Sequence, residues 1–112
     1  MKTAVHVPIR VYVKVNASAN FSSETNGQPL SSCFWARPTK GNVEVIMVEN
    51  GMQGKIKDGV LYSAVDESND GKCSVYIPSA QEDHVGIWSY TFITLDGQVL
   101  TGQVDVRHSK RL

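Results

Sequence analysis

Apolar and polar residues alternate with a period of two along most of this chain. In residues 5–17, valine recurs at positions 11, 13 and 15, with Tyr12 and Lys14 between. This alternation predicts a strand with one face against a core and the other in solvent. The same period, or a short apolar run, predicts further strands at residues 30–37, 42–49, 60–65, 73–77, 86–95 and 98–106.

Turn-forming residues separate these predicted strands. Residues 22–29 contain an Asn-Gly step and a proline and are expected to form a loop, and turns are expected at 50–54 and 66–72. Asp96-Gly97 lies between two alternating segments and is typical of a tight β-hairpin. Helical periodicity is missing, although residues 79–85 could form a single turn of helix.

Length and charge limit the possible classes of protein. A chain of 112 residues has the size of one domain, and many short strands predict an all-β sandwich or barrel. We expect this domain at residues 1–107 and a polar tail at 108–112. The 11 basic and 11 acidic side chains balance without a run of either sign, which disfavours nucleic-acid binding. No stretch approaches the ~18 apolar residues of a membrane span, so direct insertion of this domain is not expected.

The residue pattern does not indicate an enzyme. His6, His84 and His108 have no paired cysteine or carboxylate at metal-ligand spacing. Cys33 and Cys73 do not form a Cys-x-x-Cys motif, and the glycines are scattered rather than gathered in a phosphate-binding loop. We expect no catalytic activity, no cofactor and no metal.

The cysteines and the glycosylation triplets indicate the cellular compartment of the protein. Asn16 and Asn20 each begin an Asn-x-Ser triplet, the acceptor for N-glycosylation. Cys33 and Cys73 could form one disulfide or remain two buried thiols. Strand parity allows both to face the core from opposing sheets, and closing a loop of about 40 residues would stabilise the fold by roughly 4 kcal/mol. Together these features favour a secreted or cell-surface origin, with any native signal or anchor outside this chain.

Several large aromatic residues fall at strand positions that are predicted to face the core. Trp35 lies on one predicted strand, and Trp88 and Tyr90 end the stretch "DHVGIWSY" at residues 83–90. A strand tryptophan, an acid–glycine turn and paired aromatics resemble the immunoglobulin superfamily, whose usual strand F motif is Asp-x-Gly-x-Tyr-x-Cys. The resemblance covers nearly the whole chain and is strongest to the variable type. The runs "CFWARP", "GKCSVYI" and "GIWSY" are similar to invertebrate surface immunoglobulin domains. An antiparallel two-sheet sandwich is implied.

The chain also departs from the pattern of that family. Tyr90 occupies the place of the strand F cysteine, and the resemblance assigns the strand B position to Val15, Ala17 or another apolar residue. The usual B–F disulfide is therefore impossible, and the family comparison implies a strand C to strand E bridge between Cys33 and Cys73. Trp88 stands where the corner tyrosine belongs, and His84 takes the place of the acid.

A binding surface is expected on one sheet. On the parity that places Trp88 and Cys33 inside, a set of apolar residues is predicted to face outward on the sheet formed by strands G, F, C and C′. An exposed sheet face is normally polar, so such a set indicates a partner, although scattered exposed apolar residues can also have no function. The predicted members are Phe34, Ala36, Ile46, Val48, Ile87, Ile93 and Val99.

Two functions follow from these expectations. The first is the membrane-distal ectodomain of a single-pass cell-surface adhesion or allorecognition receptor, which binds itself or a related receptor on an opposing cell through this face. The alternative is a soluble, secreted immunoglobulin-like binder of a heterologous ligand. The short hairpin at Asp96-Gly97 favours recognition by a sheet face over recognition by a long loop, and balanced charge suits self-association.

Overall fold

The computed structural model describes residues 9–25, 28–38, 44–49, 54–65 and 72–109. The turns predicted at 50–54 and 66–72 lie outside the described residues except for Gly54 and Lys72, as do the start of the first predicted strand and the end of the tail. Within the described ranges the chain forms nine strands and one short 3-10 helix. These elements are β1 (Ile9–Val13), β2 (Ala19–Glu24), β3 (Leu30–Arg37), β4 (Glu44–Glu49), β5 (Lys55–Lys57), β6 (Val60–Val65), β7 (Lys72–Ile77), η1 (Glu82–His84), β8 (Gly86–Thr94) and β9 (Val99–His108).

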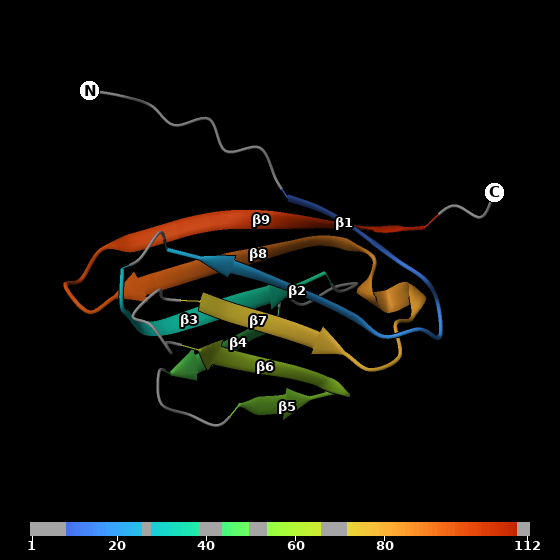
Figure 1. Ribbon diagram of the computed structural model, residues 1–112, viewed down its shortest axis with the longest axis horizontal. Helices are drawn as coiled ribbons and strands as arrows, with labels where there is room; N and C mark the ends of the chain where they lie inside the picture. Colours follow the sequence, from blue (N-terminus) through green and yellow to red (C-terminus); the bar gives the residue numbers. More distant parts are fainter. Residues whose placement is uncertain (1–8, 26–27, 39–43, 50–53, 66–71, 110–112) are drawn as a thin grey trace.

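The strands form two packed sheets (Figure 1). One sheet has the order β1-β9-β8-β3-β4 and the other the order β2-β7-β6-β5. Pairing is antiparallel except between β1 and β9, which run parallel. This is the order of an immunoglobulin-like sandwich, in which β2, β3, β7 and β8 correspond to strands B, C, E and F. β4 adds to the edge beside β3, as strand C′ does in the variable type, and β5 pairs with β6. The predicted all-β sandwich is confirmed.

The N-terminal part of the sandwich differs from the prediction. β1 ends at Val13, and Val15 and Asn16 form a turn instead of continuing the strand. Asn16 adopts the left-handed conformation, with φ of 70°. β2 then occupies residues that were expected in part to form a loop. Its inward positions carry Ala19, Phe21 and Ser23, so Phe21 is the only large apolar residue on the inward face of this strand and the alternation is weak.

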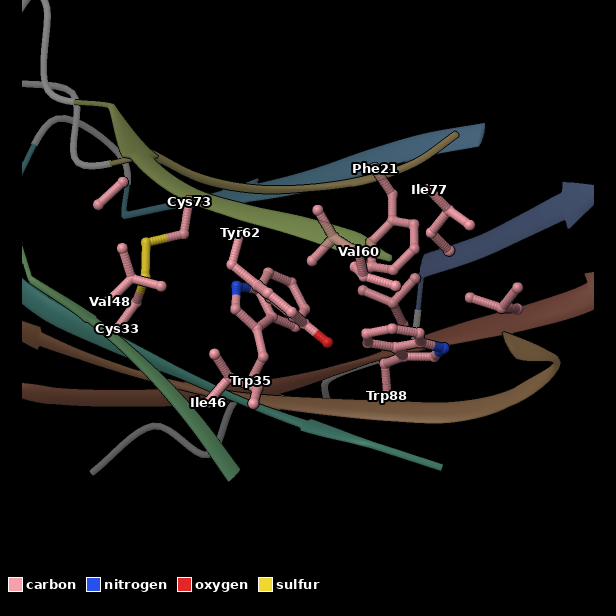
Figure 2. Packing of buried hydrophobic residues seen from close by; sticks show 14 of the residues in the cluster. Phe21, Cys33, Trp35, Ile46, Val48, Val60, Tyr62, Cys73, Ile77 and Trp88 are labelled. Atoms are coloured by element: carbon pink, nitrogen blue, oxygen red, sulfur yellow. A yellow bond between two sulfur atoms is a disulfide. The ribbon is translucent and has the colours of Figure 1, made fainter. Parts of the chain in front are cut away.

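Aromatic side chains fill the middle of the core, between the two sheets (Figure 2). Trp35 and Trp88 are fully buried, and Phe21 meets both of them edge-on, with ring centroids 5.7 Å and 5.2 Å away. Edge-to-face contacts of this kind contribute roughly 0.5–1.5 kcal/mol beyond the burial of apolar area. Val15 and Ala17 precede β2, and Phe21 is the other apolar residue that packs from strand B against the two indole rings.

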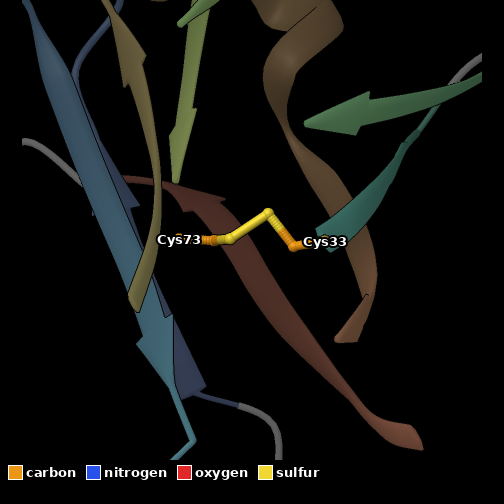
Figure 3. The surroundings of a disulfide bond; sticks show 2 residues. All are labelled: Cys33 and Cys73. Carbon is orange, nitrogen blue, oxygen red and sulfur yellow. A yellow bond between two sulfur atoms is a disulfide. The ribbon is translucent and has the colours of Figure 1, made fainter. Parts of the chain in front are cut away.

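A disulfide joins the two sheets beside this aromatic core. Cys33 on β3 bonds to Cys73 on β7, and both residues are completely buried (Figure 3). The bond therefore links strands C and E, as the resemblance implied. Val48 of β4 is the cross-strand partner of Cys33 and packs in the same core.

Tyr90 fills the strand F position with a ring instead of a sulfur atom. Its ring lies 4.8 Å from Phe92 and 5.4 Å from Trp35, measured between centroids. The ring extends over Gly102, its cross-strand partner on β9. A Cβ atom at position 102 would lie 2.9 Å from Tyr90 Cε1 and closer still to the hydroxyl oxygen, so β9 requires glycine there.

Trp88 and His84 together form the corner that precedes β8. The Trp88 indole Nε1 donates a hydrogen bond of 2.9 Å to the His84 carbonyl oxygen, four residues upstream. This bond replaces the one that a corner tyrosine makes through its hydroxyl group. His84 ends η1, the single turn expected at residues 79–85, and its buried Nδ1 accepts a hydrogen bond of 2.9 Å from the backbone N–H of Gln81. The Arg37 guanidinium lies over the Trp88 ring, 5.9 Å from its centroid.

The corner makes stability depend on pH. Burial lowers the pKa of His84, and the nearby positive charge of Arg37 lowers it further, against a weaker opposite effect of Asp83. The unfolded chain therefore binds a proton more readily than the folded one. The contribution of His84 to the free energy of unfolding is fully present above the ordinary histidine pKa of 6.5. This contribution is lost as the pH falls through 6.5 towards the lowered pKa, by at most about 1.4 kcal/mol per pH unit.

Urea unfolding between pH 7.5 and pH 5 tests this expectation. The free energy of unfolding should fall more steeply with acidification in the native chain than in His84→Gln, whose side chain can still accept a hydrogen bond but does not titrate. His108→Gln serves as the control for the other histidine in the described residues, whose ring is 44% exposed at the end of β9 and has its Nε2 atom 2.9 Å from Glu82 Oε2. Identical slopes for the native chain and His84→Gln would contradict the assignment.

Candidate binding face

The outer face of the five-stranded sheet carries most of the apolar side chains that the sequence placed outside the core. We call it the front face. Cross-strand pairing arranges its residues in rows, for example Val99, Ile93 and Ser32, then Thr101, Thr91 and Phe34. The uncharged outward residues across β9, β8, β3 and β4 are Val99, Thr101, Gln103, Ile87, Ser89, Thr91, Ile93, Ser32, Phe34, Ala36, Val45 and Met47.

Five of the seven predicted interface residues lie on this face. Ile87 and Val99 are exposed, while Phe34, Ala36 and Ile93 are half-buried by their neighbours within the sheet. They come from β3, β8 and β9, so the face draws residues that are far apart in sequence into one surface.

The other two, Ile46 and Val48, were predicted on the wrong side of the sheet. Both are buried in the core, because Ile46 pairs with inward-facing Trp35 and Val48 with inward-facing Cys33. Their β4 neighbours Val45 and Met47 face outward instead and are 56% and 40% exposed. Residues 45–48 are four consecutive apolar residues, so alternation could not choose between the two faces; only the register with β3 decides.

Charges on the front face lie at two opposite corners. The described side chains of its central rows are apolar or carry hydroxyl and amide groups, such as Thr91, Ser89 and Gln103. Glu49, at the end of β4, is exposed and lies in the row of Ile93 and Val99.

A basic group lies at the corner diagonal to Glu49. Arg10 of β1 and Arg107 of β9 both approach Asp105 Oδ2, with Nε–Oδ2 distances of 3.8 Å and 3.0 Å. Two cations around one anion leave this corner with a net positive charge. The corner lies beside Ile87, at the opposite end of β8 from Ile93. Water and salt screen such exposed pairs, so their contribution to stability is small and their effect on partner choice matters more.

The loop that joins β8 to β9 is short, as Asp96-Gly97 predicted. The Thr94 amide donates to the Gln98 carbonyl at 2.9 Å, and the Gly97 amide donates to the Thr94 carbonyl at 3.0 Å. Gly97 adopts φ of 89°, which glycine tolerates without strain. This hairpin offers little surface for a ligand compared with the adjoining sheet.

Both predicted glycosylation sites are exposed and lie off the front face. Asn16 lies in the turn between β1 and β2, where its Oδ1 accepts a hydrogen bond of 3.2 Å from Gln81 Nε2. Asn20 lies on the outer face of the four-stranded sheet, opposite Tyr76 of β7.

None of the helices within the described ranges is long and apolar enough to cross a membrane. Among those same residues, no group of three His, Cys, Asp or Glu side chains is placed to hold a metal ion. No family model matches the chain, and no curated protein matches its sequence.

Proposed function

We propose that this chain is the recognition domain of a cell-surface adhesion or allorecognition receptor, and that it binds a second copy of itself through the front face. The observation that carries the proposal is the composition of this face: Phe34, Met47, Val45 and Ile93 lie among hydroxyl side chains, and the charged groups among its described residues lie at the corners. A face of an antiparallel sheet that contacts only solvent would carry polar and charged residues throughout.

The charge distribution favours a second copy as the partner. In a two-fold contact the same patch meets itself, so residue i of one copy contacts residue j of the other and the reverse. When the axis crosses the face between two diagonal corners, each of these corners contacts the opposite corner of the other copy. Glu49 and the basic Arg10–Arg107 corner are diagonal to each other, so in this arrangement groups of opposite charge approach at both corners. A formal net charge of zero also removes long-range repulsion between identical molecules.

The variable-type resemblance supports the same proposal by analogy, because its members commonly use this sheet for pairing or for binding counter-receptors. We expect each contact to be weak, micromolar or poorer, and to become effective through many copies on two apposed membranes. The disulfide between Cys33 and Cys73 is consistent with an extracellular domain.

Bead clumping tests the proposal directly. Beads coated densely with the domain should aggregate with one another, and sedimentation of the free domain should reveal a weak, concentration-dependent dimer. Beads that stay dispersed at the highest coating density would contradict self-recognition and would favour a soluble binder of a heterologous ligand.

A further inference from the structure

The outer face of the four-stranded sheet has one apolar row. Ser22, Ser74 and Ser63 form a row of hydroxyl groups across β2, β7 and β6. In the next row, Asn20 pairs with Tyr76, Tyr76 with Leu61, and Leu61 with Ile56. Tyr76 is 39% exposed and Ile56 is 74% exposed. This row therefore crosses all four strands, from Asn20 on β2 through Tyr76 and Leu61 to the exposed Ile56 on β5.

Asn20 is placed for modification at the head of this row. It begins the triplet Asn20-Phe21-Ser22, in which Phe21 points into the core while Asn20 and Ser22 point outward. β2 is an edge strand of its sheet among the described strands, so the side chain has open space beside it. Directly opposed residues of an antiparallel pair have Cβ atoms about 4.5–5.5 Å apart, so a sugar attached to Asn20 starts beside the Tyr76 ring.

We propose that Asn20 carries an N-linked glycan whose first sugar packs on Tyr76 and covers the apolar row. Sugars bury their C–H faces on aromatic rings, and a bulky polar glycan solubilises the surface it covers. The glycan divides the molecule into a shielded four-stranded face and a bare front face. This inference requires passage through a secretory pathway, but it does not depend on what the front face binds.

The modification is a group transfer without a change in redox state. The Asn20 Nδ2 atom attacks the anomeric carbon of an oligosaccharide that is linked to a lipid diphosphate. The new N–C bond forms as the C–O bond to the diphosphate breaks, the lipid diphosphate leaves with the bonding electron pair, and Nδ2 loses one proton. The transferase and the lipid-linked donor belong to the secreting cell.

The test uses the full chain secreted from a cultured eukaryotic cell. Ser18→Ala is included throughout, because it removes the first sequon and leaves Asn16 with its turn conformation and its bond to Gln81 intact. Intact mass should show one glycan, and Ser22→Ala should abolish it. After trimming to the single asparagine-linked sugar, Tm should still exceed that of the Ser22→Ala chain by about 3–5 °C.

Tyr76→Ser separates packing from mere attachment. In that background the glycan should remain attached, and the increase in Tm that it provides should largely disappear. Secreted, folded protein with no glycan at Asn20 would overturn the proposal, and so would a glycan-dependent gain in Tm that is equal with and without the Tyr76→Ser substitution. Neither result would affect bead clumping through the front face, so the two proposals fail separately.

Discussion

A domain carrying Phe34→Asp and Met47→Asp is expected to lose self-association while remaining folded. Phe34 on β3 and Met47 on the neighbouring edge strand β4 are cross-strand partners on the front face, and neither belongs to the core cluster. In a two-fold contact, four new carboxylates would be buried without counter-charges, which costs several kcal/mol. Removing two central apolar side chains weakens binding further, so we expect the dimer dissociation constant to rise more than about 100-fold.

Sedimentation at high concentration and bead clumping both measure this loss. The matched control is Ile56→Asp, which changes an apolar side chain that is 74% exposed on the opposite sheet. Its self-association should equal that of the native chain, and Tm should show that all variants are folded. If the double variant clumps as well as the native chain, the front face is not the contact.

The second large effect concerns the bridge between the sheets. Cys33→Ala with Cys73→Ala should lower the free energy of unfolding by about 4 kcal/mol, because the unfolded chain is no longer restricted by a loop of 40 residues. In a domain of this size, that loss lowers Tm by roughly 15 °C or more. Both positions are fully buried, and the small cavity left by the sulfur atoms acts in the same direction.

Urea unfolding with and without a reductant measures the effect. The native chain should become about as unstable as the double variant when it is reduced, whereas the reductant should leave the double variant unchanged. A double variant within about 1 kcal/mol of the oxidised native chain would show that the aromatic core alone holds the sheets together.

Strict alternation explains which parts of the fold could be predicted from sequence. β6 begins and ends where the pattern placed it, because its buried residues Val60, Tyr62 and Ala64 recur at every second position. β3 also keeps its predicted bounds, although a register shift with β8 between Leu30 and Ser32 interrupts the alternation before Cys33 and Trp35. On β4, Val45 to Val48 are apolar on both parities, so the inward pair Ile46 and Val48 was assigned to the surface. On β4, the register with β3 determines which side chains face the core, and this register depends on pairing with another strand.

The N-terminal sheet edge illustrates a second limit. β2 buries Phe21 and Ser23 and exposes Asn20, Ser22 and Glu24 to differing degrees, so its composition is that of a loop. Its strand conformation comes from pairing with β7 and from the contacts of Phe21 with the two indole rings. Similarly, the sequence showed that Trp88 replaces the corner tyrosine and cannot make a hydroxyl hydrogen bond. Only the folded structure shows that its indole N–H donates to the His84 carbonyl oxygen instead.

The most direct test of self-recognition through the front face is a two-colour bead assay with charge-reversed corners. Glu49→Arg makes both corners basic, and Arg10→Glu gives the Arg10–Arg107–Asp105 corner a net negative charge. Each variant alone should clump less than the native chain, because like charges then face each other, and the two mixed together should clump again.

Glu24→Arg and Lys72→Glu form the control pair, because they change net charge equally on the outer face of the four-stranded sheet. We predict that clumping recovers when the two front-face variants are mixed. In the control pair, neither a loss of clumping by each variant alone nor a recovery in the mixture is expected. Clumping that follows net charge alone, or that is unaffected by reversing either corner, would contradict a two-fold contact through this face.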